Sequence, residues 1–161
     1  MVKISVQEED FSLQAEYDRL RTTSSGAIVT FTGLVRDFND HISTGSDKVE
    51  SLYLQHYPGM TERLLEAMVV EAQQTWNIQD VRIIHRVGRL LPGDQIVLVA
   101  VSSAHREAAF AAASFLMDYL KTRATFWKKT ATESGEQWLD MKDSDRTAAA
   151  RWQGYAGEKQ K

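Results

Sequence analysis

The order of hydrophobic and polar residues along this 161-residue chain predicts short strands interrupted by amphipathic helices. Apolar residues at every second position are typical of a half-buried strand, whereas apolar residues three and four apart indicate a helix. We therefore expect strands at 2–6, 27–35, 49–57, 81–88, 95–103, 125–131 and 136–140. We expect helices after an N-cap at Asp10 or Ser12, then at 58–76, at 104–123 and at 144–152.

The helix at 104–123 is rich in alanine, and Ser102 or Ser103 precedes it as a candidate N-cap, so we regard it as the central helix. The strands on either side of Pro92-Gly93 are predicted to pair as an antiparallel hairpin, as are the two strands on either side of "TESG". This mixture of helices and hairpins favours an α+β fold over a doubly wound parallel sheet.

The chain is expected to form one domain over residues 1–152, followed by a flexible tail at 153–161. Turn-forming residues at 37–48 predict an exposed, mobile connection. The longest apolar run, "IVLVAV", is too short to cross a bilayer, and the N-terminus lacks the features of a secretory signal. We therefore expect a cytoplasmic protein without membrane association.

Composition excludes several kinds of chemistry. The absence of cysteine removes disulfides, thiolate nucleophiles and sulfur-ligated metals, and the four histidines are not spaced as metal ligands. The sequence contains no Gly-rich phosphate loop and no nucleophile-elbow serine, so we expect neither a metal nor a cofactor. Because the net charge is −3, nucleic acid is not attracted overall, and an anionic ligand must be met by a local group of cations.

The stretch "MDYLKTRATFWKKT" is the strongest local group of cations. Lys121 falls near a helix C-terminus, where a cation is stabilised by the helix dipole, so alone it indicates little. Lys128 and Lys129 follow each other on a strand and must point to opposite faces, so at most one can share a site with Lys121. The neighbouring Phe126 and Trp127 are either core residues or part of a pocket wall for a flat ring.

Three further cations are candidates. Arg36 ends a strand, as either a solvated side chain or a ligand contact. His105 and Arg106 lie in the first turn of a helix, where positive charge opposes the dipole but free N–H groups suit phosphate or carboxylate. These two residues either bind an anion, or Glu107 offsets the charge and His105 simply packs.

Five stretches carry a family resemblance: "VTFTGLVRDFN", "HYPGMTE", "IHRVGRLLPGD", "SSAHR" and "MDYLKTRATFWKK". In this order they resemble the molybdopterin synthase catalytic (large) subunit family, from about Gly26 to Trp152. The resemblance implies an α/β-hammerhead fold of the α+β class. It also implies a homodimer that binds two small subunits, which makes a heterotetramer.

The activity implied by the resemblance is that of a sulfurtransferase. A small ubiquitin-like carrier subunit brings sulfur as a thiocarboxylate on its Gly-Gly C-terminus. Two sulfurs pass to cyclic pyranopterin monophosphate (precursor Z), which forms the dithiolene of molybdopterin in molybdenum cofactor biosynthesis. The missing cysteine agrees with this chemistry, because the sulfur arrives on the partner.

By motif position, the resemblance implies Lys121 and Lys128 as catalytic residues, and Arg36, His105 and Arg106 as substrate contacts. We add Lys129 as a substrate-binding candidate. Our hypothesis places Lys121 nearest the thiocarboxylate and Lys128 on the pterin side, although the sequence does not distinguish the exchanged assignment. A site for two anions requires several cations to converge.

Two positions depart from the family pattern. Thr125 stands where proline is common, which predicts a less rigid link between helix and strand. Leu34 stands where a basic residue can precede the Val-Arg pair, so a side-chain contact from that position is in doubt.

Two other functions remain open at this point. One is a non-catalytic homologue that keeps the pocket without transferring sulfur. The other is a small RNA-binding domain that uses the patch at 121–129, for which a steep salt dependence of RNA affinity would be the signature.

Overall fold

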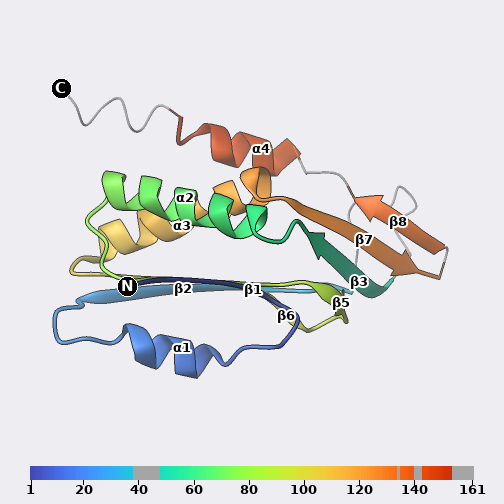
Figure 1. Cartoon of the computed structure of the whole chain (residues 1–161), viewed down its shortest axis with the longest axis horizontal. Coiled ribbons are helices and arrows are strands. Elements are labelled where there is room, and N and C mark those ends of the chain that lie inside the picture. Colours follow the sequence, from blue (N-terminus) through green and yellow to red (C-terminus); the bar gives the residue numbers. More distant parts are fainter. Residues whose placement is uncertain (38–47, 134, 140–142, 154–161) are drawn as a thin grey trace.

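The computed structural model describes residues 1–37, 48–133, 135–139 and 143–153, which form two sheets and the helices that cover them (Figure 1). The strands are β1 (Val2–Gln7), β2 (Ala27–Leu34), β3 (Val49–His56), β4 (Val81–Arg86), β5 (Gly88–Leu90), β6 (Gln95–Ser103), β7 (Phe126–Thr132) and β8 (Gly135–Leu139). The helices are α1 (Leu13–Leu20), α2 (Met60–Thr75), α3 (Arg106–Arg123) and α4 (Asp143–Ala150).

The first sheet has the strand order β1-β4-β6-β2 and lies between helices on both faces (Figure 1). β1 runs parallel to β4, whereas the other two pairings are antiparallel. Successive side chains of β4 point to opposite faces of the sheet. Ile83 lies in the main core, on the side of α2 and α3, and Ile84 lies in a smaller core, on the side of α1. Since both faces are covered, β4 and β6 are almost continuously buried.

The second sheet has the strand order β5-β3-β7-β8, is antiparallel throughout, and extends beyond the helices (Figure 1). Its inner face contributes the fully buried Leu54 and Leu90 to the main core. Gly88, with φ of 82°, takes the chain from β4 in the first sheet to β5 in the second, and a side chain would be strained in this conformation.

α3 is the central helix, as the alanine-rich pattern predicts. It packs against β6 and β2 on one side and against α2 and α4 on others. α4 is fixed to it by the Trp152 indole, which donates a hydrogen bond to Asp118 at 2.7 Å and packs edge-on against Trp76 and Phe115. The C-terminal part of the domain is thus tied to the main core.

The α+β class, the pairing of 81–88 with 95–103 and the hairpin near "TESG" are confirmed. Ser12 caps α1, accepting from the Ala15 N–H. The predicted cap of α3 is wrong: His105 is the N-cap, because Ser102 and Ser103 still belong to β6 and bond to the 77–80 segment. β5 was not predicted, and the hammerhead assignment stays a prediction.

Two predictions concern residues that the structure does not describe. Most of the expected mobile connection at 37–48 and of the expected tail at 153–161 lies outside the described residues.

Candidate functional site

Two lysines from different elements come together where α3 ends and β7 begins. Lys121 is exposed in the last turn of α3, and Lys128 is half-buried near the start of β7, opposite Leu54 of β3. Both are close enough to His85 for their charges to act on its ring. The two predicted catalytic lysines therefore both lie within electrostatic reach of the same buried histidine.

The end of α3 is held in position by Arg123. Its guanidinium forms an ion pair with Glu71 of α2 at 2.9 Å and lies over the Tyr119 ring, 3.7 Å from the centroid. Arg123 thus belongs to the cationic stretch in sequence, but its charge is used to join two helices.

The link between α3 and β7 is tied to the start of α2 by a pair of threonines. The hydroxyl groups of Thr61 and Thr125 lie 2.8 Å apart, and Thr61 is fully buried. The Thr61 oxygen also accepts from the Tyr57 N–H. Although Thr125 lacks the fixed φ of the proline common in the family, its hydroxyl anchors the link.

His85 lies beneath the lysines, at the end of β4, and is 3% exposed. Its ring stacks on Phe126 of β7, with 3.8 Å between centroids and 17° between planes. Its Nδ1 lies 2.8 Å from the backbone carbonyl oxygen of Arg86. Burial, assisted by the charges of Lys128, Lys121 and His56, lowers the pKa of His85 to about 3.

A second histidine completes this cluster. His56 ends β3 opposite Phe126, and its Nε2 lies 3.6 Å from Oε1 of Glu62 in the first turn of α2. The other Glu62 oxygen accepts from the Gly59 N–H at 2.6 Å, which fixes the carboxylate at the start of the helix. Glu62 therefore places a carboxylate beside His56, at the edge of this cluster.

Arg36 lies at the same end of the first sheet. It lies two residues after the end of β2. In the first sheet, Gly33 of β2 pairs with Val97 of β6, and Val97 also pairs with His85 of β4. Arg36 is exposed there, beside the turn that leads into β6. Its position is compatible with a ligand that reaches the lysine pair.

His105 and Arg106 lie at the opposite end of α3. Both are exposed, and the His105 side chain makes no capping hydrogen bond. At a rise of 1.5 Å per residue, the fifteen residues from Arg106 to Lys121 span about 22 Å. A single copy of the chain therefore does not bring these two residues to the lysine pair.

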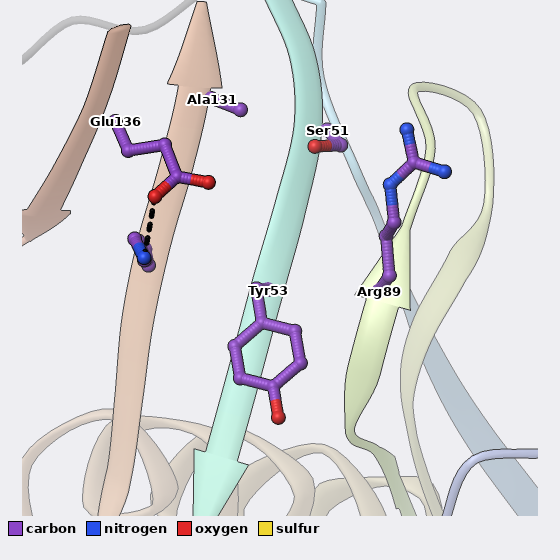
Figure 2. A pocket seen from close by; sticks show the side chains of 6 residues that line it. Ser51, Tyr53, Arg89, Ala131 and Glu136 are labelled. Carbon is purple, nitrogen blue, oxygen red and sulfur yellow. Dashed lines mark ion pairs between the residues drawn. The ribbon is translucent and has the colours of Figure 1, made fainter.

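Lys129 points to the outer face of the second sheet, as strand alternation requires. It forms an ion pair with Glu136 and lies 5.6 Å from the centroid of the Trp138 ring. A pocket of about 250 Å³ lies on this face (Figure 2). Its lining comes from β3, β5, β7 and β8, namely Ser51, Tyr53, Arg89, Lys129, Ala131 and Glu136. Glu136 offsets the charge of Lys129, whereas Lys128 lies on the opposite, inner face of this sheet.

Within the described ranges, no three histidine or acidic side chains are grouped in a way that could hold a metal ion. None of the helices in the same part of the chain is both long and apolar enough to cross a membrane.

Comparison with known proteins identifies the family. Residues 6–123 match the family described as MoaE protein. The chain belongs to this family of molybdopterin synthase catalytic subunits. The molybdopterin synthase catalytic subunit of Vibrio cholerae is 56% identical over 152 residues, which cover 94% of this chain and 98% of that protein.

Solved structures agree with this membership of the MoaE family. The molybdopterin biosynthesis MoaE protein of Burkholderia ambifaria is 49% identical, with a TM-score of 0.78 and coverage of 94% of this chain and 98% of that one. Molybdopterin synthase from Staphylococcus aureus is 31% identical, with a TM-score of 0.76 and coverage of 84% and 95%.

His85, His56 and Glu62 were not predicted as site residues, because from the sequence these two histidines were weighed only as metal ligands. One signal was available: in "VRIIHR", His85 occupies the alternate position of Val81 and Ile83, which face the core. A polar residue in such a row indicates a specific partner.

Proposed function

We propose that this MoaE-family chain transfers sulfur to cyclic pyranopterin monophosphate from the C-terminal thiocarboxylate of a small ubiquitin-like carrier subunit. Two transfers build the dithiolene of molybdopterin and open the cyclic phosphate. In each, a carbon–sulfur bond forms on the pterin side chain while a carbon–oxygen bond at the same carbon breaks, and the oxygen leaves as part of the phosphate or as water. Hydrolysis then breaks the carbon–sulfur bond of the carrier and leaves its C-terminus as a carboxylate. The chain thus acts as a sulfurtransferase that itself carries no sulfur nucleophile.

The juxtaposition of Lys121 and Lys128 carries this proposal. Both reactants are anions, and two ammonium groups beside a buried neutral ring hold them together and stabilise negative charge during transfer. We assign Lys121 to the thiocarboxylate and Lys128 to proton transfer on the pterin side. Arg36, at the same end of the sheet, contacts the substrate.

We further propose that the working form contains two copies of the chain, each joined by one small subunit. His105 and Arg106 lie about 22 Å along α3 from Lys121, so they serve as substrate contacts only if a second copy presents them. The Vibrio cholerae relative is called a catalytic subunit, and this name is consistent with an enzyme that also contains a separate carrier subunit. Lys129 stays a predicted substrate contact.

The experiment is to measure molybdopterin formed from cyclic pyranopterin monophosphate and thiocarboxylated carrier. Lys121→Ala and Lys128→Ala should each lower the rate by about a hundredfold or more, because each removes a charge that stabilises the transition state. Lys3→Ala, which removes an exposed lysine from β1, should match the wild type.

If both variants fold and bind the carrier but make little product, the proposal is supported. If the wild type forms no product with a competent carrier, the chain is a non-catalytic homologue and the proposal fails.

A further inference from the structure

His85 is a polar residue in a place where packing alone favours an aliphatic one. It shares the helix-facing side of β4 with Val81 and Ile83, and its partners in the neighbouring strands are Val6 and Val97. Burying an imidazole costs free energy unless its polar atoms are used, whereas leucine or phenylalanine at this position would carry no such cost. The ring therefore needs an explanation beyond packing.

The hydrogen bond of the ring defines its tautomer. A carbonyl oxygen only accepts, so the Nδ1 beside the Arg86 oxygen carries the hydrogen. In the neutral ring, Nε2 then holds a lone pair and acts as an acceptor. Because burial keeps the pKa near 3, this state persists at all physiological pH values.

The charged groups around the ring come from several elements. Lys128 of β7, Lys121 of α3 and His56 of β3 all act on it, and Glu62 of α2 lies behind His56. The Arg86 side chain, next on β4, points away and donates to the backbone oxygens of Glu8 and Gln95. The surroundings of His85 are thus mainly cationic, and a neutral acceptor is the group that stabilises an ammonium there without adding charge.

The stacked Phe126 provides a second connection to the lysines. Phe126 is the first residue of β7 and lies two positions before Lys128. Its N–H donates to the carbonyl oxygen of Ala124, which lies three positions after Lys121. Fixing the Phe126 ring against the first sheet therefore fixes the short segment that carries both lysines.

We propose that His85 is a positioning residue for the lysine pair: its ring fixes the start of β7 through Phe126, and its Nε2 lone pair orients a neighbouring ammonium group. This inference rests on the proposed function of Lys121 and Lys128. In this arrangement His85 acts through the lysines and does not contact the substrate.

The first test compares kcat and KM of the assembled synthase for three substitutions. His85→Phe keeps a ring on Phe126 but removes both nitrogens, and should lower kcat by about tenfold to a hundredfold with KM within about threefold. His85→Gln restores an amide acceptor and should recover part of the loss. Ile83→Val, a fully buried control on the same face of β4, should keep the wild-type kcat.

The proposal is supported if kcat is highest in the wild type, lower in His85→Gln and lowest in His85→Phe. A His85→Phe variant with wild-type kcat, or one at least as active as His85→Gln, overturns it.

The second test does not depend on activity. Nitrogen NMR of the carrier-free protein should show His85 protonated at Nδ1 only, from about pH 5 to about pH 8. The ammonium signals of Lys121 and Lys128 should shift in His85→Phe and not in Ile83→Val. Unmoved lysine signals overturn the inference, whereas shifted signals in a protein without synthase activity support it and refute only the proposed reaction.

Discussion

At the scale of single residues, burial decides which side chains at the site can hold charge. Lys121 is exposed and Lys128 is half-buried, whereas His85 is enclosed and burial lowers its pKa to about 3, so its ring stays neutral. The result is a pair of cations mounted on an uncharged polar ring. Such an arrangement suits two anionic reactants, because the attraction increases in a partly desolvated site.

The low pKa of His85 predicts a particular dependence of stability on pH. Between 6.5, its ordinary value, and about 3, the unfolded chain binds one more proton at this residue than the folded chain does. The free energy of unfolding should therefore fall as the pH decreases, by up to about 1.4 kcal/mol per pH unit from this group. His85→Phe should remove this contribution and flatten the curve.

Urea unfolding of the wild type and of His85→Phe between about pH 5 and about pH 7 measures the effect. This window lies above the range in which Asp10 and Glu16, whose carboxyl pKa values are lowered, take up protons. Ile83→Val serves as the packing control and should keep the wild-type slope. Parallel curves for the wild type and His85→Phe would show that His85 titrates normally.

The candidate residues were predictable from sequence to different degrees. Lys121, Lys128 and Arg36 lie in long family-like stretches. Alternation predicted that Lys128 and Lys129 face opposite sides, and the resemblance assigned the catalytic role to Lys128. The role of His85 was not predictable, because it depends on Phe126, which lies forty-one positions later and in the other sheet. No local pattern reports a contact of that kind.

At the scale of elements, the geometry of the site depends on the join between α2 and the α3–β7 link. Thr61 and Thr125 are sixty-four positions apart, and their hydroxyl groups form a part-buried pair. Thr61→Val keeps the shape but leaves the Tyr57 N–H without its acceptor, and should lower the free energy of unfolding by about 1–3 kcal/mol.

A double-mutant cycle separates this hydrogen bond from other effects. If the two hydroxyls bond to each other, the cost of Thr61→Val with Thr125→Val should be smaller than the sum of the single costs by about 0.5–1.5 kcal/mol. Chemical denaturation of the four proteins gives the coupling free energy. Additive costs would mean that each threonine acts alone.

Most elements followed from local patterns, because the amphipathic period of α2 and the continuous apolar run of β6 are strong and long. β5 did not, since three residues are too few to show alternation. The division into two sheets was also out of reach: β3 pairs with β7, some seventy residues away, and such pairing is set by the assembled core.

At the scale of the whole molecule, two features point to further subunits. The outer face of the second sheet exposes Tyr53, Trp127 and Trp138 by 45%, 47% and 53%, and aromatic side chains of this kind are enriched at protein interfaces. In addition, the cationic N-terminus of α3 is separated from the lysine pair by nearly the whole helix. Sequence patterns within one chain do not report which surfaces of two copies meet.

A mixing experiment tests whether two copies share one site. Lys121→Ala and Arg106→Ala should each inactivate the synthase, because each site would take its lysines from one copy and Arg106 from the other. A mixed dimer would then hold one doubly substituted site and one intact site. Co-expression with random pairing should restore about a quarter of the wild-type rate, since half of the dimers are mixed and each has one working site. If each site lies within a single copy, every site in the mixture carries one substitution, and the rate stays at the level of the variants alone.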